Sequence, residues 1–323
     1  VVFGSVALMA VACLVASAAN GYAGLMLAAA LLGVGNCAFH PVDFTILNQR
    51  VSTPRLGYAF SVHGLTGNLG WAAAPVFMMG ISALSGWRTA YVAAALLYAG
   101  ILILLVLRRD LLLTTPRPQV APGQATESDL AFMRLPVVWW CFAFFLLSTM
   151  TLAVVQNFSV PILKALQNIS LETASMTLTA YMLCGAIGMF AGGFVAARYP
   201  LWSDRVVATC MTTAALCMAL CASGLFGPMG TVAVLAATGF AVGVGGPSRD
   251  LMIKKATPKG ATGRVYGMVY SGLDVGFAIS PLIFGVFMDR GWYAATLLGA
   301  ALVLLLSVGA ALGVGKRTAT TSA

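Results

Sequence analysis

The chain has 323 residues, of which 60% are hydrophobic and only 8% are charged, and its formal net charge is +9. Because a soluble domain carries about 25% charged residues, this composition excludes a soluble globular protein and indicates a polytopic membrane protein. The seven cysteines lie in apolar runs without CxxC or His/Cys ligand spacing, which argues against a disulfide framework and against a zinc site.

Apolar segments long enough to span a bilayer recur along the whole chain. A spanning helix needs about 20 apolar residues, and we find such segments at 1–19, 22–48, 57–84, 89–107, 136–163, 172–197, 206–226, 231–253, 263–288 and 292–314. The longest break, 109–134, is rich in Pro, Thr and Gln, which favours a cytoplasmic linker. The sequence therefore predicts an all-α, two-bundle protein with ten helices: four in an incomplete N-terminal half-bundle, 1–108, and six in a C-terminal bundle, 135–323.

The positive charges predict the orientation of these helices. If residue 1 starts on the cytoplasmic side, 14 of the 18 Lys and Arg residues fall on that side and three on the other, while Arg249 lies inside a helix. Such asymmetry is typical of the cytoplasmic loops of membrane proteins. Orientation alone explains the basic net charge, so we expect no nucleic-acid partner. The C-terminus is predicted to be cytoplasmic, in a plasma membrane, and the Ala-rich composition favours a bacterial inner membrane.

Residues that distort helices recur at a fixed offset of 206 positions. Without a gap, Gly33, Pro41, Gly57, Gly70 and Pro75 correspond to Gly239, Pro247, Gly263, Gly276 and Pro281. A repeat of Gly/Pro-interrupted apolar helices is typical of transporters built from two related halves. Since residue 207 corresponds to residue 1, the segment 135–206 has no counterpart in the first half. We therefore expect two further helices, about 70 residues, to precede the chain.

Several motifs resemble those of the major facilitator superfamily. Gly64-Leu-Thr-Gly67 through Trp71-Ala-Ala-Ala-Pro75 resembles the signature of that family's fifth helix, and Gly86-Trp87-Arg88 resembles the start of its sixth. Segment 193–198, followed by Asp204 and Arg205, is similar to a degraded copy of the family's loop between helices eight and nine. Within the family, Gly33-Val-Gly35 followed by Phe39-His40-Pro41 resembles the fosmidomycin-resistance transporters.

This resemblance implies a twelve-helix fold of which the chain holds helices 3 to 12. It also implies that helices 4, 7 and 10 line a cavity, that helices 5, 8 and 11 pack the halves together, and that the remaining helices face lipid. The charges follow the same layout, because every intramembrane His, Asp and Arg falls on 22–48, 57–84, 231–253 or 263–288. A charge within hydrocarbon costs about 3 kcal/mol or more, so it is expected to face a cavity or a partner.

Three residues of the first half are candidates for coupling or gating. Asp43 is an intramembrane acid, a functional candidate by default, with a structural ion pair as the alternative. His40 lies three residues earlier and shares a helix face with Asp43; the alternative is a histidine that only satisfies hydrogen bonds. His63 lies at a similar depth on the next helix, and its repeat equivalent is Val269, so the half-bundle fold does not require a histidine there.

In the second half, Arg249 occupies the position equivalent to Asp43. Equivalent positions of two halves lie at equal depth, so we predict that Asp43 and Arg249 approach each other when the cytoplasmic side closes and form an inner gate. In the alternative, Asp250, the neighbour of Arg249, or a group on 263–288 pairs with Arg249 permanently, and Asp43 titrates alone.

Asp274 corresponds to Asn68 in the repeat and lies about 15 Å along its helix from the basic turn at Arg264. This is the deepest acid of the chain, and we expect it to carry a proton. Gln156 and Asn157 are neutral amides on segment 136–163 that would suit hydrogen bonds to a substrate. The alternative for both amides is a structural hydrogen bond between helices.

The leading hypothesis is a secondary active transporter that moves a small organic solute by alternating access and is coupled to protons, and the subgroup resemblance favours efflux. One alternative is an organic-anion uptake symporter, and another is an inactive truncated fragment; the buried Arg249 favours an organic anion in either direction of transport. An intramembrane enzyme or sensor is disfavoured because no HExxH motif is present. We expect no cofactor beyond the proton gradient, and a monomer whose partners are its solute and the lipid bilayer.

Overall fold

The computed structural model describes residues 1–114, 131–258 and 261–321. Within them, nine helices are long and apolar enough to cross a membrane, counting Tyr22–Arg50 as one, and Val2–Ala18 is a shorter apolar helix. The all-α fold expected from the sequence is therefore confirmed. Residues 115–130 of the predicted linker, 259–260 and the side chain of Pro75 lie outside the described residues.

The α-helices are α1 (Val2–Ala18), α2 (Tyr22–Asn36), α3 (Phe39–Arg50), α4 (Leu56–Ser85), α5 (Trp87–Leu107), α6 (Pro136–Gln167), α7 (Leu171–Arg198), α8 (Ser203–Ala222), α9 (Pro228–Ala256), α10 (Thr262–Asp289) and α11 (Tyr293–Thr321). Short 3₁₀ helices occur at Thr53–Arg55 (η1), Arg109–Leu112 (η2), Ala131–Arg134 (η3) and Pro200–Trp202 (η4). These bounds follow the ten apolar segments closely, because in hydrocarbon the backbone must satisfy its own hydrogen bonds.

The chain divides into two compact units. Unit 1 comprises Val1–Ser52, Leu69–Gln124 and Thr262–Gly267, and unit 2 comprises Thr53–Asn68, Ala125–Ala261 and Met268–Ala323, in so far as these residues are described. The helices α4 and α10 each contribute to both units. The half-bundle boundaries predicted from the sequence, at 108 and 135, stay predictions.

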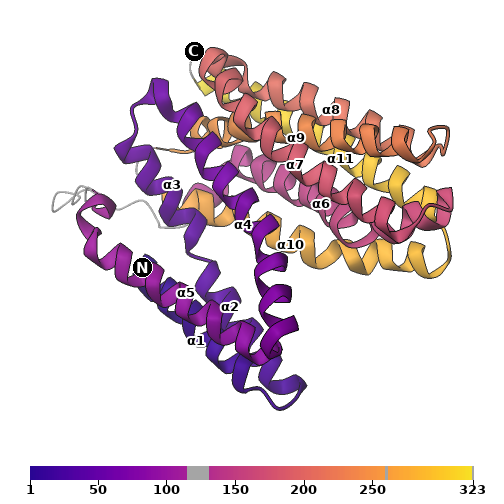
Figure 1. Cartoon of the computed structure of the whole chain (residues 1–323). Helices are drawn as coiled ribbons and strands as arrows, with labels where there is room; N and C mark the ends of the chain where they lie inside the picture. The colour runs from indigo at the N-terminus through magenta and orange to yellow at the C-terminus, as the bar shows by residue number, and fades with distance from the viewer. Residues whose placement is uncertain (115–130, 259–260, 322–323) are drawn as a thin grey trace. The chain divides into compact units, whose positions relative to one another are not determined.

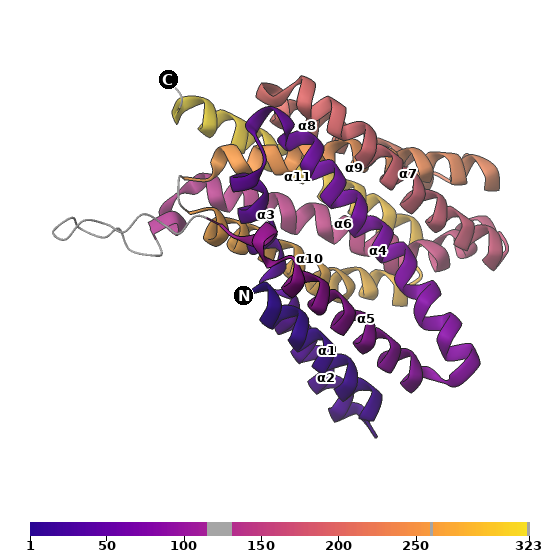
Figure 2. The same cartoon turned by 60° about the vertical axis from the view of Figure 1, so that its left-hand side comes forward.

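In unit 1, α1 packs against both α2 and α5 (Figure 1 and Figure 2). A guanidinium nitrogen of Arg88, at the start of α5, donates to the carbonyl of Ala19 at the end of α1, at 2.8 Å. Gly35 of α2 allows a close approach to α1, because a Cβ there would lie 2.8 Å from Met9 Cγ and 3.1 Å from the Ser5 carbonyl oxygen.

The segment 22–48 is interrupted between α2 and α3. Pro41 has no N–H for the carbonyl of residue 37, so a regular helix loses a hydrogen bond at that point, and α2 ends at Asn36 while α3 begins at Phe39. The buried Phe44 of α3 stacks on Tyr266 with ring centroids 4.6 Å apart. This contact attaches the N-terminal part of α10 to α3.

In unit 2, α7 and α9 pack backbone against backbone. Two GxxxG pairs make this possible: Gly188 and Gly192 on α7, and Gly239 and Gly243 on α9. A Cβ on any of the four would collide with a backbone carbonyl oxygen of the other helix. Small residues at this spacing let membrane helices approach closely, so these glycines fix the position of α9 within the unit.

A third GxxxG pair joins α10 to α6 in the same unit. A Cβ on Gly272 would lie 2.7 Å from the carbonyl oxygen of Phe142, and one on Gly276 would lie 2.7 Å from that of Leu146. These two glycines hold α10 close to α6.

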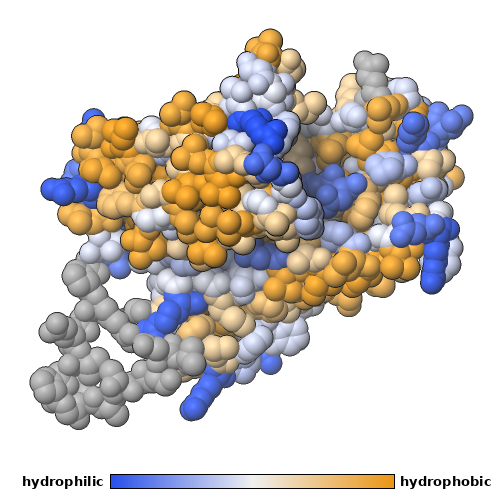
Figure 3. Space-filling model, turned by 90° about the horizontal axis from the view of Figure 1, so that it is seen from below, coloured by the Kyte–Doolittle hydropathy of each residue, from blue (hydrophilic) through white to orange (hydrophobic). Residues whose placement is uncertain are grey.

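Apolar residues form broad areas on the face of the molecule that Figure 3 shows, in orange. In unit 2, exposed leucines include Leu216 and Leu220 on α8 and Leu302 and Leu306 on α11. Exposed apolar faces of this extent in helices of spanning length are typical of lipid contact. The sequence had predicted lipid contact for 206–226 and 292–314, the segments that these two helices occupy.

Candidate functional site

The polar centre of unit 2 begins with α9, which carries Arg249 and Asp250 directly after a glycine-rich turn. Pro247 lies inside α9, yet the helix continues from Pro228 to Ala256. A proline inside a helix normally breaks or kinks it. Here α7 packs tightly against α9, with Gly192 facing Pro247, and a Cβ on Gly192 would lie 3.0 Å from Pro247 Cδ. This packing supports an unbroken helix and a defined position for Arg249.

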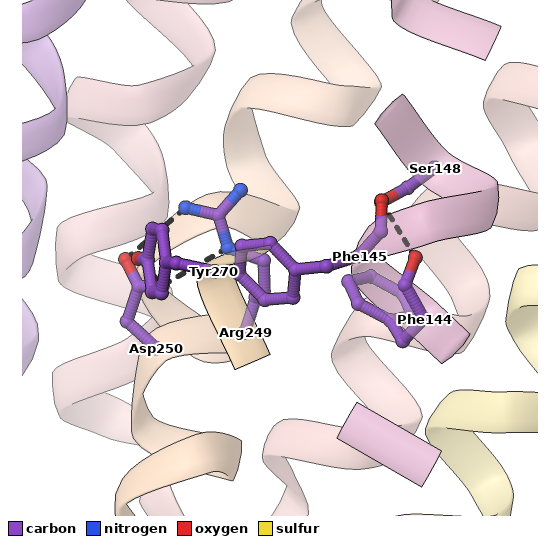
Figure 4. A network of polar contacts seen from close by, with 6 residues as sticks. All are labelled: Phe144, Phe145, Ser148, Arg249, Asp250 and Tyr270. Atoms are coloured by element: carbon purple, nitrogen blue, oxygen red, sulfur yellow. Dashed lines mark hydrogen bonds and ion pairs between the residues drawn. The ribbon is translucent and has the colours of Figure 1, made fainter. Parts of the chain in front are cut away.

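Arg249 and Asp250 form a two-pronged ion pair (Figure 4). The Arg249 Nε donates to Asp250 Oδ1 at 2.9 Å, and a terminal guanidinium nitrogen donates to Oδ2 at 3.3 Å. Neighbouring side chains on a helix point about 100° apart, so the pair forms only because the long arginine side chain bends back. The Asp250 side chain is 3% exposed and that of Arg249 is 28% exposed, which leaves the guanidinium as the more accessible partner.

Two aromatic residues from other helices complete this centre. The Tyr270 hydroxyl, on α10, donates to Asp250 Oδ1 at 3.1 Å. The guanidinium carbon of Arg249 lies 4.9 Å from the ring centroid of Phe145, on α6, and that ring packs on Tyr270 at 4.6 Å. Next to it, the Ser148 hydroxyl donates to the Phe144 carbonyl at 2.7 Å. We call Phe145, Arg249, Asp250 and Tyr270 the polar cluster.

The polar cluster is electrically neutral but costly to disturb. Its carboxylate accepts hydrogen bonds from both Arg249 and Tyr270, and its guanidinium has a cation–π contact with Phe145. Removing one partner of a buried ion pair typically costs about 3–5 kcal/mol, because the other charge is left without compensation. A proton on Asp250, or an anion at Arg249, would weaken this pair without breaking a covalent bond.

Asp274 lies on α10 four residues after Tyr270, so the two side chains share one face of the helix. Gly272 and Gly276, which flank Asp274, face α6, and Asp274 itself is exposed within the described structure. Ionisable residues in membrane helices almost always face a bundle interior or a water-filled cavity. The carboxylate lies one helical turn, about 6 Å, beyond Tyr270 along α10.

The two amides of α6 are placed differently from each other. Gln156 is half-buried and lies on the same face of α6 as Phe145, three turns further along. Asn157 is exposed, and its side-chain nitrogen donates to the carbonyl of Ala153 at 2.9 Å. Both belong to unit 2, and their contact with a substrate stays a prediction.

The remaining candidates lie on α3 and α4. His40 and Asp43 are half-buried on α3, in unit 1, while His63 and Asn68 are half-buried on α4, in the part that belongs to unit 2. Asp43 and Arg249 belong to different units, so the predicted inner gate between them stays a prediction. The contact of Arg249 with Asp250 is the one that the sequence had offered as its alternative.

Sequence reasoning found Arg249 and Asp250 but missed Phe145 and Tyr270. Both aromatic residues lie on helices other than α9, more than 15 residues away in the chain, and neither carries a charge that would single it out. The only available signal was the spacing of Tyr270 and Asp274, one turn apart on one helix face. Among the described residues, no group of three or more His, Cys, Asp or Glu could hold a metal ion.

Comparisons with known proteins give one consistent family. The family profile described as Major Facilitator Superfamily matches residues 1–163 and 153–322. A comparison with curated proteins gave no match. Similar solved structures include FucP, a Major Facilitator Superfamily transporter in the outward conformation, at 15% identity and a TM-score of 0.71, covering 97% of this chain and 82% of that one.

Two other transporters have the same fold. The human organic anion transporter MFSD10 (TETRAN) is 18% identical with a TM-score of 0.74, covering 96% of this chain and 76% of that one. A bacterial homologue of the iron transporter ferroportin, in an outward-facing state, is 11% identical with a TM-score of 0.70, covering 99% of this chain and 83% of that one. At these identities the likeness shows the fold alone.

Proposed function

Because this chain belongs to the Major Facilitator Superfamily, we propose that it is a secondary active transporter that moves a small organic solute by alternating access and couples this movement to protons. Members of the family are transporters and not enzymes. The chain is a multi-pass membrane protein with a two-repeat architecture. As expected from the sequence, the proposal places it in a bacterial inner membrane as a monomer, with its C-terminus in the cytoplasm.

The polar cluster is the observation that carries this proposal. Arg249 and Asp250 lie well inside α9, a helix of membrane-spanning length. Apolar residues of similar volume would pack there at no electrostatic cost, and a buried ion pair is weak support for stability. Charges retained at such positions are functional candidates. We assign Arg249 to solute recognition and Asp250 to the control of Arg249.

Asp274 is the proposed proton carrier. It is an exposed carboxylate in the interior of α10 and lies one turn from Tyr270, which donates to Asp250. Alternating access would expose this carboxylate first to one side of the membrane and then to the other. A proton bound at Asp274 on one side would then be released on the other, and its charge change would bias the neighbouring polar cluster.

Organic-anion transport is the second candidate, and one observation favours it. The Arg249 side chain is 28% exposed while its partner Asp250 is 3% exposed, so an incoming anion reaches the guanidinium before it meets the acid. A guanidinium forms two parallel hydrogen bonds with a carboxylate or a phosphonate. The human relative MFSD10 (TETRAN) is described as an organic anion transporter, which supports the same solute class.

The direction of coupling can be tested in proteoliposomes with a labelled anionic probe, fosmidomycin, and a labelled neutral probe, L-fucose. Efflux by proton exchange predicts accumulation of the probe when the interior is acidic, because protons leave as the solute enters. Uptake by symport predicts accumulation when the interior is alkaline.

We expect accumulation of fosmidomycin in vesicles with an acidic interior and none without a pH gradient. Accumulation of either probe that is the same with and without the gradient would contradict proton coupling. Accumulation only with an alkaline interior would replace efflux by the uptake alternative. If L-fucose accumulates and fosmidomycin does not, Arg249 is not a receptor for anions.

A further inference from the structure

Unit 2 contains a second feature, a cavity at the end of α9 and outside the polar cluster. This cavity of about 960 Å³ lies where α8 begins and where α9 and α11 end, with the start of α6 as a further wall. In the predicted topology this is the cytoplasmic end of the unit. Ligand pockets commonly measure about 300–1,000 Å³, so the cavity has room for a charged headgroup.

The lining of this cavity is strongly cationic. Among the described residues, it includes the cations Arg205, Lys255, Lys316 and Arg317 and one acidic residue, Asp204. Lys255 Nζ donates to the Ser203 hydroxyl at 2.9 Å. An ammonium group has three donors, so Lys255 can bind this hydroxyl and an anionic oxygen at the same time.

Aromatic rings hold two of the arginines at the cavity wall. The guanidinium carbon of Arg205 lies 4.3 Å from the centroid of Trp202, and that of Arg317 lies 5.2 Å from the centroid of Trp140. A ring below a guanidinium limits its motion, and the guanidinium carries five N–H donors in its plane. This arrangement suits a multidentate oxyanion such as a phosphate.

The single acid of the lining has a structural explanation. Asp204 lies in the first turn of α8, where a negative charge is stabilised by the helix dipole. Its carboxylate lies directly against α11 at Gly315, where a Cβ would collide with Asp204 Oδ2. This close approach places Lys316 and Arg317, the next two residues of α11, at the cavity. Among the described residues of the lining, four cationic side chains therefore lie beside one carboxylate.

Apolar and interfacial residues form the rim on the side of η4. Leu201 is 81% exposed and Trp202 is 53% exposed, and both also line the cavity. Tryptophan is enriched at the depth of the lipid headgroups. The cavity thus combines a cationic interior with an apolar rim, which is the combination that an amphiphilic anion requires.

We propose that this cavity binds a phosphate group, and that the phosphate is that of an anionic phospholipid headgroup. Basic pockets between membrane helices on the cytoplasmic side are typical binding sites of anionic lipid headgroups. The four cations bind the phosphate oxygens, while Leu201 and Trp202 contact the glycerol backbone and the start of the acyl chains. A soluble phosphate compound has the same anionic chemistry but makes no use of the rim.

The test compares the purified full chain with two double variants that remove the same charge. Lys316→Gln/Arg317→Gln alters the cavity, and Arg55→Gln/Arg198→Gln removes two cations from outside its lining. Native mass spectrometry measures the apparent affinity for phosphatidylglycerol against phosphatidylcholine, with inorganic phosphate and glycerol 1-phosphate as soluble competitors.

We expect the wild type and the control variant to prefer phosphatidylglycerol, and the cavity variant to bind it about tenfold more weakly, as the loss of charge-assisted hydrogen bonds predicts. Equal binding by the two double variants would overturn the proposal. Displacement of the lipid by either soluble compound at equal concentration would overturn the lipid source and assign the cavity to a soluble phosphate.

A measurement on the wild type covers the case in which the cavity variant does not fold. Phosphatidylglycerol with a photoreactive headgroup should label residues 200–205 or 315–318, as read by peptide mapping. Label confined to other segments would overturn the assignment. Lys255→Gln removes a single cation from the lining and leaves Arg55 and Arg198 in place. This variant should reduce the labelling of residues 200–205 and 315–318.

Discussion

Substitution of Gly243 by alanine tests the backbone contact that positions the polar cluster. A Cβ at this position would lie 2.9 Å from the Met189 nitrogen and 3.0 Å from the Gly185 carbonyl carbon, and it would collide with the Gly185 carbonyl oxygen. Carbon atoms in contact prefer separations of about 3.5–4.0 Å, so α7 and α9 would have to separate by about 0.5 Å or more. Overpacking of this kind costs about 1–3 kcal/mol.

The matched control is Gly309→Ala on α11, where a Cβ would have no neighbour within 4 Å. Both changes carry the same helix-propensity gain, at most about 1 kcal/mol, so their difference isolates the collision. At about 2–4 °C per kcal/mol for a unit of this size, Gly243→Ala should melt about 2–12 °C below Gly309→Ala in detergent, as followed by fluorescence-detected size-exclusion chromatography. Equal melting temperatures would refute the backbone contact between α7 and α9.

Three further changes probe the polar cluster and the inner gate. Tyr270→Phe removes the donor to Asp250 at 3.1 Å and keeps the ring, so it should cost about 1 kcal/mol of stability in the same melting assay; an unchanged melting temperature would contradict that hydrogen bond. Arg249→Gln should abolish fosmidomycin transport and Arg249→Lys should restore only part of it, because an ammonium lacks the planar fork; full activity of the Gln variant in proteoliposomes would remove Arg249 from recognition. For the predicted inner gate, Asp43→Arg and Arg249→Asp should each impair transport and the double swap should restore part of it; a swap no more active than the worse single variant would reject the gate.

The sequence predicted the helices well because their cause is local. Each apolar run of spanning length must form helix in lipid, and all ten segments are helical, with 22–48 divided into α2 and α3. The same reasoning did not foresee that Pro41 would accompany a helix break while Pro247, its repeat equivalent, lies in the unbroken α9. Around Pro247, α9 packs tightly on α7, a tertiary contact that proline spacing does not reveal.

Only the charged residues of the candidate site could be predicted from the sequence. Arg249 and Asp250 stand out in an apolar helix, and their adjacency already suggested mutual neutralisation. Tyr270 and Phe145 carry no net charge and come from α10 and α6, so their meeting depends on the GxxxG contact between those helices. The basic cavity could not be predicted from the sequence either, because its cations lie on three separate chain segments. In the sequence, each of these cations indicated only the orientation of the helices.

Proton coupling through Asp274 is tested most directly by Asp274→Asn in proteoliposomes with an imposed pH gradient. The matched control is Asp289→Asn, which neutralises the exposed acid at the far end of the same helix. The account predicts that Asp274→Asn abolishes gradient-driven accumulation of the transported probe while counterflow exchange continues, and that Asp289→Asn retains both. Undiminished uphill accumulation by Asp274→Asn would contradict it.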